Sequence, residues 1–223
     1  MTTIEAVLFD LDGTLIDSEA LIGVALAETL ARHGVHFDPS AVDRIVGPPM
    51  TVMIERVAGV NSEVARAIFH EYTMLYLETY APRALPMPGA VALLDGLATA
   101  GVPLALVTNK DESSARTALG YLGWMSRFTA IVGADSTPRP KPEAEHALEA
   151  MRRLDARATS TAFVGDLDVD MACGSAAGLA RVIGLANGMA PEALRAAGAT
   201  HVCATLAEVA TLLDLPRPAQ VAR

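Results

Sequence analysis

From Pro86 onward, short apolar runs alternate with segments that repeat with the period of a helix. Alternation of this kind predicts right-handed β-α-β units and an open parallel sheet. An earlier run, Ile4–Phe9, is apolar on both faces and stops at Asp10, which is typical of a buried central strand. The later runs that we expect to be strands are Leu104–Val107, Ala130–Val132, Thr161–Val164, Val182–Gly184 and His201–Val202.

Between the first strand and Pro86 the pattern is helical. The segment from Ser18 to His33 has apolar residues at helical spacing and ends at Gly34, a C-cap residue. Further helical stretches follow at Val42–Val46, Val52–Val57 and Val64–Tyr80, and no convincing strand is found between about residues 16 and 82. The sequence therefore predicts an α/β protein with an all-α insertion after its first strand.

This organisation gives explicit domain boundaries. We expect residues 1–15 and 83–215 to form the α/β core, residues 16–82 a helical cap, and residues 216–223 a flexible tail. Pro82, Pro86, Pro88 and Gly89 mark the exit from the insertion and predict a hinge there.

Composition narrows the function class. Lys and Arg total 17 against 26 Asp and Glu, so the net charge of −9 argues against nucleic-acid binding. No apolar stretch reaches the roughly 20 residues that a bilayer requires, so no membrane contact is expected. Without a leader pattern we expect a cytoplasmic protein with Cys173 and Cys203 reduced and buried. The sequence leaves the oligomeric state open.

Two carboxylates follow the first strand in the string Asp10-Leu11-Asp12-Gly13-Thr14-Leu15-Ile16-Asp17-Ser18. Residues at i and i+2 of an extended chain point to the same side, and the glycine permits a sharp turn. One acid can attack while the other moves protons. An Asp-Gly pair alone is an ordinary turn signal, but the full string is far more specific.

Other polar groups follow later strands, at the sheet edge where open α/β proteins bind ligands. Thr108-Asn109-Lys110 offers a hydroxyl, an amide and backbone N–H groups for phosphate oxygens, although this motif alone is more often an N-cap or a turn. Lys141 stands between Pro140 and Pro142, and the next helix is expected to begin at Pro142.

An acidic cluster follows the strand Thr161–Val164. Gly165-Asp166-Leu167-Asp168-Val169-Asp170 offers carboxylate oxygens, which suit Mg²⁺. The five histidines are dispersed without zinc-like spacing and are expected to be surface or packing residues.

In their order and spacing, these motifs resemble the haloacid dehalogenase superfamily, and within it the phosphoglycolate-phosphatase-like hydrolases with a helical cap. The resemblance implies a Rossmann-like core and makes Asp10 the nucleophile and Asp12 the general acid/base. It makes Thr108, Asn109 and Lys141 the phosphate- and substrate-binding residues. Mg²⁺ would be held by Asp10, the backbone carbonyl of Asp12, and Asp166. Asp170 would orient Lys141 or a metal-bound water.

The chain departs from that pattern in two places. Leu167 stands where many relatives carry Ser or Thr after Gly-Asp, and Lys141-Pro142 continues as Glu143-Ala144 rather than with a second proline. Asp168 has no assigned role and is expected to be solvated or to cap a helix.

The predicted function is hydrolysis of a small phosphorylated metabolite, phosphoglycolate-like, with Mg²⁺ and an aspartyl-phosphate intermediate. Asp12 argues against dehalogenation, because a halide leaves without a proton. A phosphosugar mutase of the β-phosphoglucomutase type and a non-catalytic phospholigand sensor stay as alternatives. The cap loop from Arg44 to Met50 is a candidate for substrate selection. Arg44 could meet a substrate carboxylate or second phosphate, or lie on the outer helix face.

Overall fold

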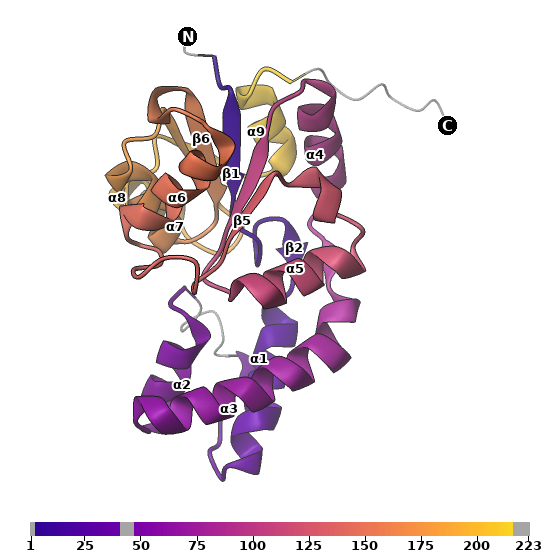
Figure 1. Ribbon diagram of the computed structural model, residues 1–223, viewed down its shortest axis with the longest axis vertical. Helices are drawn as coiled ribbons and strands as arrows, with labels where there is room; N and C mark the ends of the chain where they lie inside the picture. The colour runs from indigo at the N-terminus through magenta and orange to yellow at the C-terminus, as the bar shows by residue number, and fades with distance from the viewer. Residues whose placement is uncertain (1–2, 41–46, 216–223) are drawn as a thin grey trace.

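The computed structural model describes residues 3–40 and 47–215, and it contains a six-stranded parallel sheet in the upper half of Figure 1. The strand order is β5-β4-β1-β6-β7-β8, so β1 lies inside the sheet with a neighbour on each side. The strands are β1 Ala6–Phe9, β4 Leu104–Val107, β5 Ala130–Val132, β6 Thr161–Gly165, β7 Arg181–Leu185 and β8 His201–Cys203. The predicted parallel α/β sheet is confirmed, with strand ends that differ by one or two residues.

Helices cover both faces of this sheet because successive side chains of a strand point in opposite directions. On β1, Val7 and Phe9 pack into one apolar cluster with α4, α5 and α9, whereas Leu8 packs into another with α6, α7 and α8. The helices are α4 Ala90–Thr99, α5 Glu112–Tyr121, α6 Ala144–Leu154, α7 Asp168–Ala176, α8 Pro191–Ala196 and α9 Leu206–Leu212. The core is therefore a three-layer sandwich.

The helices inserted after β1 have a core of their own and form the lower half of Figure 1. This part, the cap, contains α1 Glu19–Arg32, α2 Met50–Ala58, α3 Ser62–Leu75, a π-helical turn Tyr76–Tyr80 and a 3₁₀ turn Ala81–Arg83. Ile22, Leu26 and Leu30 of α1 pack there against Ile54 of α2 and Ile68 of α3. The predicted stretch Val42–Val46 and the predicted tail lie outside the described residues.

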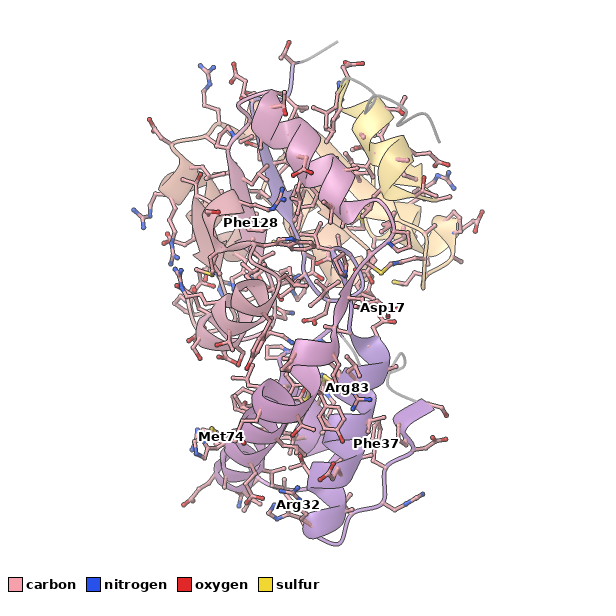
Figure 2. All side chains as sticks on the ribbon, turned by 90° about the vertical axis from the view of Figure 1, so that its right-hand side faces the viewer. Asp17, Arg32, Phe37, Met74, Arg83 and Phe128 are labelled. Carbon is pink, nitrogen blue, oxygen red and sulfur yellow. The ribbon has the colours of Figure 1, made fainter. Side chains whose placement is uncertain are left out.

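The prediction of no strand from residue 16 was wrong at its first two positions. β2 Ile16–Asp17 pairs antiparallel with β3 Leu85–Pro86, so the entry and exit of the cap form a short ribbon. Figure 2 shows Asp17 at the narrow connection between the two halves. Two residues per strand are too few to show a period of two, which is why the pattern missed them. The domain boundaries near residues 16 and 82 stay a prediction.

Two smaller expectations have different outcomes. Helix α6 begins at Ala144 rather than at Pro142, because Glu143 still has extended backbone angles and precedes the helix as its N-cap. Cys173 and Cys203 are both free and buried, as predicted. Within residues 3–40 and 47–215, no helix has the length and apolar character needed to cross a membrane.

Candidate active site

The predicted site residues come together at the carboxyl edge of the sheet. Asp10 follows β1, Thr108 follows β4 and Asp166 follows β6, and these three strands are direct neighbours. All three side chains are buried, with at most 5% exposed. Parallel strands bring residues far apart in sequence to one edge, which is where α/β proteins bind ligands.

Lys141 lies between two aspartates of this group. Its ammonium donates to Asp10 Oδ1 at 2.7 Å and to Asp170 Oδ1 at 2.6 Å. Asp170, on the first turn of α7, also accepts the backbone N–H of Leu167 through Oδ2. Burial alone would lower the pKa of Lys141, but the Asp10 and Asp170 carboxylates hold that pKa above its usual value. Lys141 is therefore a fixed positive charge beside Asp10.

Asp10, Asp166 and Asp170 form a buried carboxylate cluster whose oxygens lie within 4.8 Å of one another. Burial, opposed by the Lys141 ammonium and reinforced by Asp170, raises the pKa of Asp10 to about 7. Burial together with Asp10 and Asp170 also raises the pKa of Asp166 well above its usual range. The Lys141 ammonium pairs with Asp10 and Asp170 but not with Asp166, so the three acids repel one another when ionised and together offer a donor set of hard oxygens. Such a set fits a divalent cation of the Mg²⁺ type.

The turn after β1 fits closely against Asp166. Gly13 has a φ of +81°, and a Cβ there would lie 2.5 Å from Asp166 Oδ2, so both the backbone and the space require glycine. Thr14 Oγ1 donates to Asp166 Oδ1 at 2.5 Å. Asn187, which follows β7, donates its amide to the Gly13 carbonyl. The turn thereby fixes the orientation of the Asp166 carboxylate.

The Asp12 side chain lies outside that cluster. Its Oδ1 accepts from Ser18 Oγ at 2.6 Å, and its Oδ2 forms a 2.9 Å ion pair with Lys110. The Lys110 ammonium also lies 4.6 Å from the ring centroid of Tyr76, so it connects Asp12 of the core to the cap. Because both carboxylate oxygens of Asp12 already have partners, the group of Asp12 that is predicted to bind the metal is its backbone carbonyl. That role stays a prediction.

Thr108 and Asn109 extend the site toward the cap. Thr108 Oγ1 accepts the backbone N–H of Lys110 at 3.2 Å. The Asn109 amide nitrogen donates to the Gly47 carbonyl at 2.5 Å and to the Lys141 carbonyl at 3.0 Å, so it joins the cap loop to the Lys141 loop. The predicted contacts of Thr108 and Asn109 with phosphate stay predictions.

Sequence reasoning gave no role to several residues that support this site: Thr14, Ser18, Lys110, His146 and Asn187. Thr14 and Ser18 were visible inside the first motif, where a hydroxyl close to two carboxylates is a usable signal. Lys110 ended the second motif, but its pairing with Asp12 depends on the tertiary fold. The same holds for His146, whose Nε2 lies 2.9 Å from the Gly133 carbonyl and whose Nδ1 accepts the Lys141 N–H at 3.4 Å.

The structure also shows where Leu167, which departs from the family pattern, and Asp168, which had no assigned role, lie. Leu167 lines the cavity described below and supplies only its backbone N–H to Asp170. Asp168 is exposed on the first turn of α7, where its Oδ1 accepts the N–H of Val169.

A cavity of about 440 Å³ lies between this edge and the cap. Asp10, Asp12, Thr108 and Lys141 line its core side, whereas residues of α2, α3 and the loop 47–49 line its cap side. Arg44, the residue considered for a substrate carboxylate, lies outside the described residues.

A family model described as haloacid dehalogenase-like hydrolase matches residues 7–183. The chain belongs to the haloacid dehalogenase-like hydrolases. A protein of Dickeya dadantii (strain 3937) named Probable phosphatase IndB is 35% identical over 209 residues, which cover 91% of this chain and 90% of the relative. Phosphoglycolate phosphatase of Rhodospirillum rubrum is 32% identical over 224 residues, which cover 96% and 92%.

The solved structures agree on the fold. CbbY from Rhodobacter sphaeroides, in complex with phosphate, has a TM-score of 0.84 at 24% identity and covers 96% of this chain and 100% of its own. With the curated relatives, this places the chain in the phosphoglycolate-phosphatase-like branch, as the motifs predicted, and identifies it as a phosphoric monoester phosphatase. Its substrate is a small phosphate ester.

Proposed function

We propose that Asp10 of this phosphatase attacks the phosphorus of a small phosphate monoester and forms an aspartyl-phosphate. One observation carries the proposal: Asp10 is buried at the end of β1, and its carboxylate lies 2.7 Å from a fixed ammonium. Covalent catalysis of this type divides one difficult displacement into two easier ones. Lys141 beside the attacked phosphorus supplies positive charge where negative charge grows in the transition state.

The proton steps belong to Asp12. As the bond from phosphorus to the leaving oxygen breaks, Asp12 gives that oxygen its proton, so the product leaves as an alcohol. Asp12 then takes a proton from water as the water oxygen attacks the phosphorus, and the bond to Asp10 breaks to release phosphate. General acid and base catalysis of this kind contributes roughly 10²–10⁴ in rate. Ser18 and Lys110 hold the Asp12 side chain on the side of the core that faces the cap.

The metal is Mg²⁺ in this proposal, since phosphatases of this superfamily generally use it and the carboxylate cluster fits a hard cation. Asp10, Asp166 and the Asp12 backbone carbonyl would hold it, whereas Asp170 would remain paired with Lys141. When bound, Mg²⁺ neutralises phosphoryl charge and orients the ester for in-line attack.

The decisive experiment traps the covalent intermediate. Protein is mixed with a ³²P-labelled phosphate monoester and Mg²⁺, quenched in acid, and divided into samples with and without hydroxylamine, which cleaves acyl phosphates. We expect protein-bound label that hydroxylamine removes, and none in Asp10→Asn. Asp168→Asn is the matched control, because Asp168 is an exposed aspartate at the same end of the sheet. Label of equal amount on Asp10→Asn would refute the nucleophile assignment.

A further inference from the structure

The cavity is large for the ester of a two-carbon acid. Its volume of about 440 Å³ falls within the range of roughly 300–1,000 Å³ that is typical of sites for drug-sized ligands. The phosphoryl group occupies only the end near Asp10, Thr108 and Lys141. The remaining space lies against the cap, and it has room for a leaving alcohol larger than two carbons.

The charged side chains that the structure describes on the cavity wall, which do not include residues 41–46, do not suit an anionic leaving group. Among the described residues that line it, the carboxyl and ammonium groups are those of four aspartates and two lysines. Lys110 is paired with Asp12 at 2.9 Å, and Lys141 is paired with Asp10 and Asp170. No lysine of this wall is therefore left to pair with a substrate carboxylate. A buried charge without a partner is strongly unfavourable.

The described part of the cap wall is uncharged and mainly apolar and aromatic, and its polar groups are hydroxyls, of which those of Tyr72, Thr73 and Tyr76 are buried without a hydrogen-bond partner. Phe69, Tyr72 and Tyr76 follow one another along one face of α3 and its π turn, with stacked rings at centroid distances of 6.4 and 5.7 Å. Ile22, Met50 and Met53 complete this side of the cavity. Burial raises the pKa of Tyr72 well above its usual value, so its phenol stays neutral. Aromatic faces of this kind bury a large area against another ring.

From these observations we infer the substrate class: phosphate monoesters whose leaving alcohol is uncharged and has an apolar, ring-sized body. The inference rests on the proposed phosphatase function and narrows it. Its competitor is the small anionic ester of the phosphoglycolate type, the substrate after which several relatives of this chain are named.

Four esters separate size from charge. Benzyl phosphate has a neutral ring, 4-carboxybenzyl phosphate adds only a charge, ethyl phosphate removes only the ring, and phosphoglycolate is small and charged. We expect kcat/KM with Mg²⁺ to be highest for benzyl phosphate, by at least about tenfold over each of the others, since losing even one apolar group in such a pocket costs roughly 10–200-fold. Equal or better turnover of either carboxylate ester, or of ethyl phosphate, would overturn the inference.

Adding a cation to the cap wall gives a second test. Met50→Arg places a guanidinium on the half-buried first turn of α2, and it should move the ratio of kcat/KM for benzyl over 4-carboxybenzyl phosphate toward the charged ester by at least about fivefold. Met74→Arg is the control, because Met74 is 48% exposed on α3 and lies outside the cavity. Thr51→Arg, the next residue of the same wall, replaces Met50→Arg if that variant does not fold. An unchanged ratio in the folded variant would contradict the inference.

Binding distinguishes the failure of this inference from the failure of the proposed function. Calorimetry with Asp10→Asn and Mg²⁺ compares the affinities of benzyl and 4-carboxybenzyl phosphate without turnover. One outcome is that wild type hydrolyses none of the four esters but Asp10→Asn binds benzyl phosphate more tightly than 4-carboxybenzyl phosphate. That outcome would keep the inferred ligand class and refute the proposed reaction. Hydrolysis that favours phosphoglycolate would keep the reaction and refute the ligand class. Neither hydrolysis nor preferential binding would refute both.

Discussion

The two walls of the cavity are built on opposite principles. On the core wall, ionised groups are buried and paired: Lys141 reaches Asp10 and Asp170 within 2.7 Å, and Lys110 reaches Asp12 at 2.9 Å. On the cap wall, stacked rings and methionines supply surface without charge. Directional ionic contacts tolerate little displacement, whereas apolar contact depends mainly on shape and area. Changes to the core wall should therefore affect every substrate alike, and changes to the cap wall should affect substrates differently.

Removing the metal should have the largest effect, because it acts on the core wall for all esters. In excess EDTA we expect phosphate release to fall to background for every ester, and to return when Mg²⁺ is added back. Zn²⁺ should restore little, since the described carboxylate cluster contains no Cys or His. Phosphate release is measured by a colorimetric assay after exhaustive dialysis. Full activity in EDTA would contradict the Mg²⁺ assignment.

Lys141→Gln should lower kcat by about 10²–10³, in line with the loss of one preorganised donor, and KM should change far less. The loss should be the same for neutral and charged esters. Because the variant leaves Asp10 and Asp170 buried without a cation, it should also unfold more easily, by several kcal/mol. Kinetics are therefore measured on samples whose fold is checked by circular dichroism. A kcat/KM equal to wild type would show that Lys141 has no part in the reaction.

Gly47→Val should act on the cap side, with a smaller and uneven effect. Gly47 has a φ of +132°, which strains a β-branched residue, and its carbonyl accepts from Asn109. We expect kcat/KM for benzyl phosphate to fall about tenfold and that for ethyl phosphate to fall less than threefold. Gly59→Val is the control, because Gly59 also has a positive φ but lies outside the cavity. A uniform loss across the esters would leave the loop without a role in selection.

The smallest effect concerns stability rather than turnover. Burial, with help from the Lys141 charge, lowers the pKa of His146 to about 4, and its ring nitrogens fit a neutral tautomer that donates to Gly133 and accepts from Lys141. Between pH 6.5 and 4 the unfolded chain therefore binds more protons at this position than the folded chain. The stabilisation is present above pH 6.5 and is lost as the pH falls to 4, by up to ~3 kcal/mol.

Urea unfolding of wild type and His146→Gln at pH 7 and 4.5 measures that loss. The free energy of unfolding of wild type should fall more steeply than that of the variant, since the acids common to both proteins cancel in the comparison. His70→Gln, at an exposed histidine, should show no such difference. A difference between wild type and His146→Gln that is the same at both pH values would contradict the prediction.

The sequence allowed the residues of the core wall to be predicted, but not those of the cap wall. Asp10, Thr108 and Asp166 could be predicted because each ends a buried strand, and parallel strands must deliver such residues to one edge. Phe69 and Tyr72 could not, because apolar residues at helical spacing look the same whether they face a helical core or a ligand cavity. The pairing of Lys110 with Asp12 and the ribbon of Ile16 with Pro86 depend on contacts between distant segments that no local pattern encodes. The cytoplasmic location stays a prediction.

The sequence contains two lysines, and the fold places both beside the cavity, with side chains only 10% and 2% exposed. Both side chains that a lysine-directed acylating reagent can modify are therefore largely buried. The reagent modifies them only to the extent that the cap moves away from the core. The extent of acylation at Lys110 and Lys141, measured by mass spectrometry, then reports the opening of the cap without an engineered label.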